Sequence, residues 1–163
     1  MATFGFIGIG NMGGAIARAV CRTVNPLEVW VAAQHPERAE EFSREQGSVP
    51  SDNLTIAREA KFVILGVKPQ YMESVLTELK PILEVRTDCV LVTMAAGLTM
   101  QNIANMVGGG YPVIRIMPNT PARIGKGVIL YDANDRVQPE DLAEFLAAMT
   151  GAGMLDRLPE RLI

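Results

Sequence analysis

The sequence predicts an open, doubly wound α/β fold, in which a mostly parallel sheet carries helices on both faces. Short apolar runs alternate along the chain with segments whose apolar residues recur at helical spacing. Strand, helix and strand in repeated order are typical of such a sheet, because each crossover helix covers one of its faces. The chain has 163 residues, 48% of them hydrophobic, which is enough for one sizeable core.

Six short apolar runs are the predicted strands. They are bounded by glycine, proline and polar residues, as buried strands of a parallel sheet usually are. They cover residues 3–9, 27–33, 61–67, 89–93, 113–117 and 127–131.

Helices are predicted between and after these strands. Proline opens three of them, because the first helical position needs no N–H donor, and a threonine cap and a glycine stop mark other ends. The markers are the apolar face Ala15, Ile16, Ala19 and Val20, the prolines Pro36, Pro69 and Pro139, the cap Thr99 of a helix through residue 107, and the stop Gly151.

The charge balance argues against binding to nucleic acid or to an anionic membrane. Fifteen basic and 18 acidic residues give a net charge of −3, so no basic field attracts phosphates. The amino terminus lacks the basic region of a secretory signal. The uncharged stretch at 89–114 is interrupted by Gly108-Gly109-Gly110 and Pro112, so it lacks the unbroken apolar span of a membrane helix. We therefore expect a cytoplasmic protein.

No metal site and no cysteine nucleophile is expected. Cys21 and Cys89 lie in separate apolar runs, and the only histidine, His35, is adjacent to neither. Two such thiols are typical of reduced core residues, although an incidental disulfide stays open because their distance is unknown. A Cys/His zinc site needs a spacing that this chain does not have.

A glycine-rich turn carries the strongest functional signal. Gly8-Ile9-Gly10-Asn11-Met12-Gly13 has the spacing GxGxxG, directly after the first predicted strand and before the first predicted helix. In that context Gly8 permits the turn, Gly10 lets a pyrophosphate approach the backbone, and Gly13 lets helix and strand pack closely. The free N–H groups of the helix start favour an anion. The sequence therefore predicts a dinucleotide site in a Rossmann-type sheet; the alternative is a loop that merely turns the chain.

The end of the second predicted strand bears on the choice of cofactor. Where a carboxylate usually binds a free ribose 2′-OH, the chain has Gln34, His35 and Pro36, followed by Glu37 and Arg38. Gln34 and His35 can donate hydrogen bonds to a 2′-phosphate, and Arg38 can pair with it. These residues favour NADP, with NAD possible because Glu37 could bind the ribose instead. Otherwise Arg38 and His35 are ordinary surface residues.

Three further loops leave the carboxyl ends of predicted strands, where ligands bind in open parallel sheets. They are Gly66-Val67-Lys68-Pro69, Ala95-Ala96-Gly97 and residues 117–121. Lys68 could contact phosphate or ribose, or be simply exposed. Asn119, between two prolines, could bind a carboxamide or a water, or serve the turn. Both are weak catalytic candidates, and the catalytic residue stays unknown.

No side-chain constellation for acid–base or nucleophilic chemistry is present. The single histidine precedes proline, which makes a Ser-His-Asp set improbable. Hydride transfer needs positioning more than side-chain chemistry, since the nicotinamide carries the reaction. The sequence therefore favours a nicotinamide-dependent oxidoreductase with a small-molecule substrate.

The motifs together resemble pyrroline-5-carboxylate reductase. The resemblance rests on Phe6 to Met12, Val67-Lys68-Pro69, Met94 to Gly97 and, most specifically, Arg115 to Ala122, and it covers essentially the whole chain. It implies NAD(P)H-dependent reduction of 1-pyrroline-5-carboxylate to L-proline, the last step of proline biosynthesis. It also implies that Ile7 to Met12 contact the pyrophosphate, that Gln34, His35 and Pro36 lie by the ribose, and that Asn53 contacts the adenosine. Gly66 to Pro69, Ala95 to Gly97 and Asn119 would line the rest of the cofactor cleft.

The same resemblance implies more chain than the 163 residues. Family members continue into a helical domain that binds substrate and forms a homodimer or larger homo-oligomer. We therefore expect residues 1–158 to form the dinucleotide-binding domain and residues 159–163 to begin that helical domain, and we expect this part alone to be poorly active. Two alternatives stay open: another NADP-dependent reductase, such as a 3-hydroxyacid dehydrogenase, and a nonenzymatic NADP(H)-binding module.

Overall fold

A computed structural model describes residues 2–163 and contains one mixed sheet with the strand order β3-β2-β1-β4-β5-β6-β7-β8. All neighbouring strands are parallel except β6 and β7. The strands are β1 (Phe4–Ile7), β2 (Val29–Ala32), β3 (Val49–Pro50), β4 (Phe62–Leu65), β5 (Val90–Thr93), β6 (Val113–Met117), β7 (Gly127–Ala133) and β8 (Gly153–Arg157). The chain runs outward from β1 to β3 and then returns to the other side of β1, so the sheet is doubly wound as predicted.

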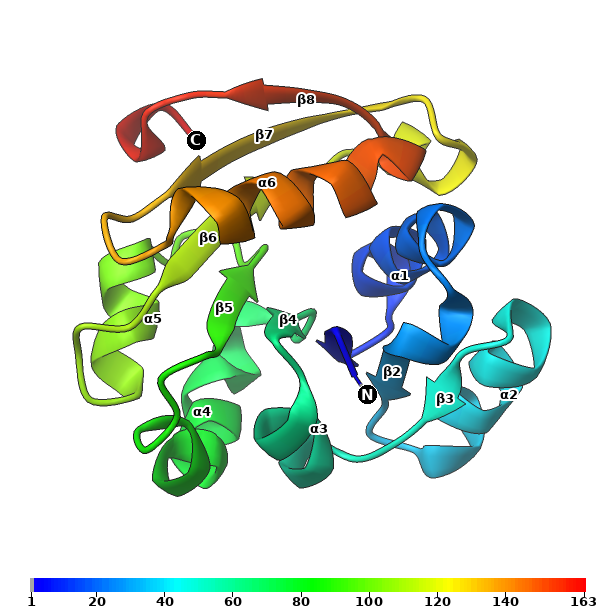
Figure 1. The fold of residues 1–163 in the computed structure, drawn as a ribbon, viewed down its shortest axis with the longest axis horizontal. Helices are drawn as coiled ribbons and strands as arrows, with labels where there is room; N and C mark the ends of the chain where they lie inside the picture. The colour runs from blue at the N-terminus through cyan, green and yellow to red at the C-terminus, as the bar shows by residue number, and fades with distance from the viewer. Residues whose placement is uncertain (1) are drawn as a thin grey trace.

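Helices cover both faces of this sheet (Figure 1). They are α1 (Asn11–Thr23), α2 (Pro36–Gln46), α3 (Asn53–Glu59), α4 (Pro69–Leu83), α5 (Met100–Met106) and α6 (Pro139–Ala148). Short 3-10 turns are η1 (Pro26–Glu28), η2 (Thr120–Ile124), η3 (Met149–Ala152) and η4 (Glu160–Leu162). Helices α1, α2 and α6 pack on one face, and α3, α4 and α5 on the other.

Two hydrophobic layers lie back to back across the strands. Because successive strand residues point to opposite faces, Phe6 belongs to the layer under α1 and its neighbour Ile7 to the layer under α4. Phe62 stacks on Phe4 with ring centroids 5.3 Å apart and contacts Phe145 of α6 at 5.7 Å. Strands β1, β4 and β5 are buried along their whole length, which explains why they are continuous apolar runs in the sequence.

Four strands are shorter than their predicted runs, β5 by the single residue Cys89 and the other three by more. Strand β1 ends at Ile7, because Gly8 adopts a φ of +95° and turns the chain toward α1. Residues 26–28 form η1, which Asn25 caps by accepting the N–H of Leu27 at 3.0 Å, so β2 starts only at Val29. Strand β4 similarly covers only Phe62–Leu65.

Three elements were not predicted from the sequence. Helix α3 and strand β3 fall between the second and third predicted strands, and β8 forms the far edge of the sheet. The predicted last helix ends at Ala148 and continues only as η3. Where residues 159–163 were expected to begin a helix, Glu160–Leu162 form the 3-10 turn η4. The domain boundary at residue 158 stays a prediction.

None of the helices within residues 2–163 combines the length and the apolar composition required to cross a membrane.

Candidate functional site

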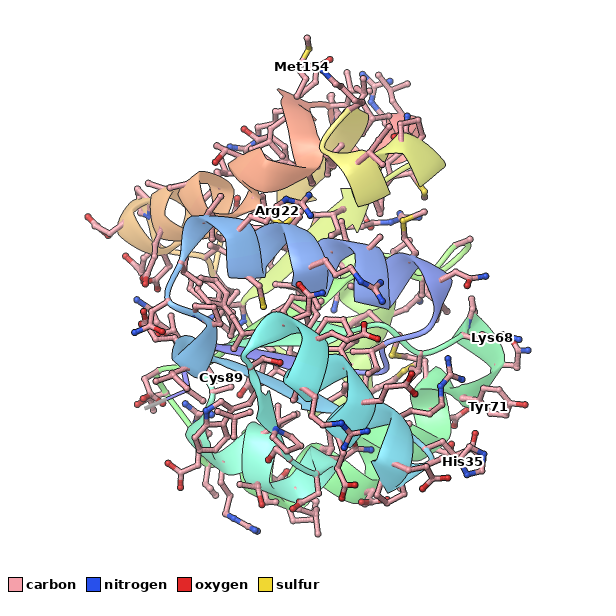
Figure 2. All side chains as sticks on the ribbon, turned by 90° about the vertical axis from the view of Figure 1, so that its right-hand side faces the viewer. Arg22, His35, Lys68, Tyr71, Cys89 and Met154 are labelled. Carbon is pink, nitrogen blue, oxygen red and sulfur yellow. The ribbon has the colours of Figure 1, made fainter. Side chains whose placement is uncertain are left out.

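The candidate site lies at the carboxyl ends of β2, β1 and β4, where the strand order reverses. Loops leaving these strands bring the glycine-rich turn, the start of α2 and the start of α4 together at the carboxyl end of the strands. Figure 2 shows His35, Tyr71 and Lys68 at this end, with Cys89 at a distance from them. A crevice at such a switch point is the usual ligand site of an open α/β sheet.

Glycines bring the backbones of three elements into contact beneath this crevice. A Cβ at Gly13 would lie 2.4 Å from the carbonyl oxygen of Gly8, and one at Gly66 would lie 2.3 Å from the same oxygen. The N–H of Gly66 donates to the Ile7 carbonyl at 2.7 Å, which ties the turn after β4 to β1. Side chains at these positions would push α1 and β4 away from β1. Gly66, predicted as a cleft residue, therefore also has a packing role.

Gly10 has different surroundings, because a Cβ there would meet no atom within 4 Å. It is the N-cap of α1, and no side chain caps this helix end. The first helical bond runs from Gly14 N–H to the Gly10 carbonyl at 2.7 Å, so the preceding N–H groups are not used within the helix. No acidic residue occupies the first turn. This uncovered, positive helix end is shaped for a phosphate group.

Two adjoining cavities extend from the glycine turn. The larger, about 360 Å³, is lined by many of the predicted cofactor residues. Its lining is Gly8, Ile9, Gly10, Ala33, Gln34, His35, Arg38, Gly66, Val67, Lys68 and Tyr71. No Asp or Glu lines it, whereas Arg38 and Lys68 supply two positive charges. This composition suits an anionic ligand.

The second cavity, about 240 Å³, lies between the end of β2 and the helices α3 and α4. Its lining is Ile7, Gly8, Ala32, Ala33, Gln34, Asn53, Val67, Tyr71, Ser74 and Val75. It includes the predicted residue Asn53, and again no carboxylate. Tyr71, Ser74 and Val75 were not predicted as site residues from the sequence.

Several predicted residues line neither cavity. Asn11, Met12 and Gly13 form the first turn of α1, and Pro36 and Pro69 are the first residues of α2 and α4. Ala95 is buried, while Ala96 and Gly97 are exposed beyond the end of β5. Gly97 has a φ of +79° and open space around it. These residues lie at the loops following β5 and thus on the far side of β4 from β2.

Asn119 has a structural partner. Its side-chain oxygen accepts the N–H of Val128 at 3.1 Å, which fastens the loop after β6 to the start of β7. The turn role weighed for this residue is therefore present in the fold. A contact between its amide and a cofactor stays a prediction.

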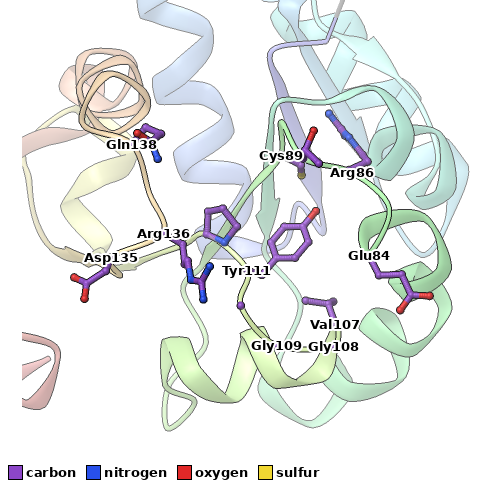
Figure 3. Close-up of a pocket in the computed structure, with 13 residues that line it drawn as sticks. Glu84, Arg86, Cys89, Val107, Gly108, Gly109, Tyr111, Asp135, Arg136 and Gln138 are labelled. Carbon is purple, nitrogen blue, oxygen red and sulfur yellow. The ribbon is translucent and has the colours of Figure 1, made fainter.

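A further hollow, about 660 Å³, lies at the opposite end of the strands, beside the amino ends of β5 and β6. Figure 3 shows Tyr111 in its middle, with Arg136 on one side and Glu84 on the other. The Tyr111 hydroxyl donates to the Leu83 carbonyl at 2.9 Å. Burial raises the pKa of the Cys89 thiol in its wall to about 11, so this thiol stays protonated at neutral pH and is a poor nucleophile. The hollow is far from the glycine turn and carries none of the predicted site residues.

Within residues 2–163, no three histidine, cysteine or acidic side chains gather as metal ligands would. Cys21 and Cys89 are free thiols, as expected.

Comparison with known families decides the assignment. Residues 3–97, which include β1 to β5 and the whole crevice, match the family described as NADP oxidoreductase coenzyme F420-dependent. The chain belongs to this family. Membership accounts for the glycine turn and its position after the first strand.

Individual family relatives confirm the resemblance to pyrroline-5-carboxylate reductases. The chain is 33% identical to the enzyme of that name from Escherichia coli over 162 residues, covering 98% of this chain and 60% of the relative. A solved pyrroline-5-carboxylate reductase from Coxiella burnetii superimposes with a TM-score of 0.89 at 28% identity, covering 97% of this chain and 59% of that one. The reductase from Plasmodium falciparum, solved with NADP bound, has the same fold, with a TM-score of 0.84 at 24% identity, covering 98% of this chain and 58% of that one. The chain thus spans about 60% of the length of the relatives it matches.

Proposed function

We propose that the chain is the NADP(H)-binding part of a pyrroline-5-carboxylate reductase, an enzyme that reduces 1-pyrroline-5-carboxylate to L-proline. The observation that carries the proposal is the uncovered start of α1 at Gly10, next to a cavity without carboxylates. The curated relatives support the choice of substrate, because they carry the name of this enzyme. We further propose a cytoplasmic, homodimeric or higher homo-oligomeric enzyme.

The residues of the crevice divide into two groups by their chemistry. The N–H groups at the start of α1, above the contact of Gly8 with Gly66, would hold the pyrophosphate. Gln34, His35 and Arg38 would hold the ribose and its 2′-phosphate. His35 is the N-cap of α2 but its side chain makes no cap bond, which leaves the ring free to donate. This donor set favours NADP over NAD.

The bound cofactor would supply the hydride, so the protein would mainly orient the reactants. The loops at Ala95–Gly97 and Asn119 follow β5 and β6, on the side of the sheet away from the ribose-binding residues. We propose that they face the nicotinamide. Lys68, exposed at the start of α4, could contact phosphate or ribose oxygens.

Titration of the purified chain with NADPH and NADH tests the cofactor assignment. We expect a complex with both and a tighter one with NADPH. Gly10→Val should weaken both complexes at least tenfold, because the added side chain occupies the approach to the helix N–H groups. Absence of binding by the unmodified chain to either dinucleotide would contradict the proposal.

A turnover measurement tests the proposed substrate separately from cofactor binding. We expect the 163-residue chain to bind NADPH but to oxidise it slowly with pyrroline-5-carboxylate, since catalysis needs both reactants held in contact. The matched control is a pyrroline-5-carboxylate reductase of full length under the same conditions. Rapid oxidation by the 163-residue chain would contradict this part of the proposal.

A further inference from the structure

Tyr71 is an exposed aromatic residue at the junction of the two crevice cavities. It lines both of them, and 56% of its surface is accessible. Exposing a large aromatic ring to water is unfavourable in free energy, and such rings are enriched at binding sites. Nothing in the fold requires a ring here, because the buried face of α4 is supplied by Met72, Leu76 and Leu79.

The first turns of α4 hold the backbone of Tyr71 in place. Tyr71 is the third residue of the helix, and its N–H donates to the Lys68 carbonyl at 2.9 Å. Ser74 Oγ donates to the Tyr71 carbonyl at 3.0 Å. Because residues three and four apart share a helix face, Tyr71, Ser74 and Val75 form one wall of the smaller cavity.

The rest of that cavity is apolar at its base and polar at one edge. Ile7 and Ala32 are buried beneath it, and Val67 and Val75 flank the ring. Asn53, half-buried at the start of α3, has a side-chain amide that can both donate and accept. A cavity of about 240 Å³ with an apolar base and one donor–acceptor side chain suits a purine base. The cavity lies on the β2 side of the glycine turn, where the adenosine end of the dinucleotide would extend.

We infer that Tyr71 forms the stacking wall of the adenine site, with the base lying between its ring and the end of β2. This inference rests on the proposed dinucleotide-binding function. Stacking on an aromatic ring needs the π-face and not the hydroxyl, so a phenylalanine at this position should serve equally well. Tyr71 thus provides affinity for the adenine, and the charged residues of the larger cavity select the phosphate.

Binding of NADPH and of 2′,5′-ADP, which keeps the adenine and the 2′-phosphate but lacks the nicotinamide, tests the inference by calorimetry. Tyr71→Ala should weaken both complexes about five- to tenfold, from the usual strength of base stacking. Tyr71→Phe should stay within about twofold of the unmodified chain on the same grounds. Leu27→Ala, which removes an apolar side chain that is 62% exposed in η1, is the matched control and should change neither affinity.

The outcomes distinguish a failure of the dinucleotide-binding function from a failure of the stacking role of Tyr71. If the unmodified chain binds neither ligand, the dinucleotide function fails. If it binds NADPH but Tyr71→Ala binds equally well, or if Tyr71→Phe loses as much affinity as Tyr71→Ala, the stacking role is overturned. Unfolding midpoints of the variants show whether the fold is intact, and we expect them to be unchanged because the ring is exposed. Should Tyr71→Ala be unfolded, the comparison of Tyr71→Phe with Tyr71→Leu decides, since leucine keeps apolar bulk without an aromatic face.

Discussion

Gly10 and Gly13 belong to one motif, but a side chain added at each would meet different surroundings. At Gly13 the new Cβ would be 2.4 Å from a backbone oxygen, whereas at Gly10 the space is open. We predict that Gly13→Ala lowers the free energy of unfolding by about 1–3 kcal/mol, since the backbone must shift to relieve the overlap. Urea denaturation measures this loss.

Gly10→Ser is the matched control for that variant. Serine is a favourable N-cap, so this change should leave the free energy of unfolding equal or slightly higher. Its hydroxyl would compete for the N–H groups at the helix start and weaken NADPH binding. An equal loss of stability in both variants would contradict the division of roles between the two glycines.

At the scale of single elements, α3 depends on one cap. Asp52 Oδ1 accepts the Thr55 N–H and Oδ2 the Thr55 hydroxyl, each at 2.9 Å. We predict that Asp52→Ala lowers the free energy of unfolding by about 1 kcal/mol, while Asp52→Asn, which keeps an acceptor, lowers it less. Denaturant unfolding at pH 7 compares the two variants.

The same cap makes a pH-dependent contribution. The hydrogen bonds from Thr55 hold the pKa of Asp52 below its ordinary value. A carboxyl whose pKa is lower in the folded state stabilises the fold fully above its unfolded pKa of about 3.9 and loses this effect as the pH falls through the folded value. The stability difference between the unmodified chain and Asp52→Asn should therefore shrink as the pH falls below the unfolded pKa of about 3.9. A difference that stays constant as the pH falls well below the unfolded pKa, in the range where the fold persists, would contradict this account.

Elements with a strong internal pattern could be predicted from the sequence, and elements defined by their neighbours could not. Helix α4 was predictable because Met72, Leu76, Leu79 and Leu83 mark one face. Strand β3 has only two residues, and it is a strand because Trp30 and Val31 of β2 lie beside it. Strand β8 similarly exists through its pairing with β7.

The site divides in the same way. Spacing alone identified the glycine turn and the loops that follow β2 and β4. The second role of Gly66 was hidden, because its contact with Gly8 joins residues far apart in the sequence. Tyr71 was missed because a tyrosine in the first turn of an amphipathic helix has no sequence feature that distinguishes a ligand wall from ordinary surface.

At the scale of the whole molecule, the two ends of the sheet serve different purposes. The carboxyl end of the parallel strands presents the loops and helix starts that form the crevice, while the opposite end is fastened by structural bonds. Lys61, for example, bonds to Glu144 at 2.6 Å and Asp141 at 3.0 Å and so ties β4 to α6. The bonds of Lys61 therefore lie at the end of β4 opposite the crevice.

The two hydrophobic layers share one sheet, so we predict that they unfold as one unit. Phe62 contacts Phe4 and Phe145 in the layer under α1 and α6. Phe62→Leu should lower the free energy of unfolding by about 1–2 kcal/mol through lost volume and ring contacts. Trp30, the only tryptophan, packs against the other layer. In a cooperative domain its fluorescence transition should shift in urea by the same amount as the far-ultraviolet circular dichroism.

Val85→Ala is the control, because Val85 is 76% exposed and should shift neither transition. If Phe62→Leu moves the circular dichroism midpoint and leaves the Trp30 transition in place, the layers unfold separately. Coincident shifts would mean that a substitution near α6 also lowers the stability of β2, which lies beside the crevice. Phe62 and Trp30, the residues changed and observed, are 32 positions apart in the chain. Core substitutions would then reduce dinucleotide binding by unfolding the site. In such variants added NADPH should raise the free energy of unfolding again, because the ligand binds only the folded chain.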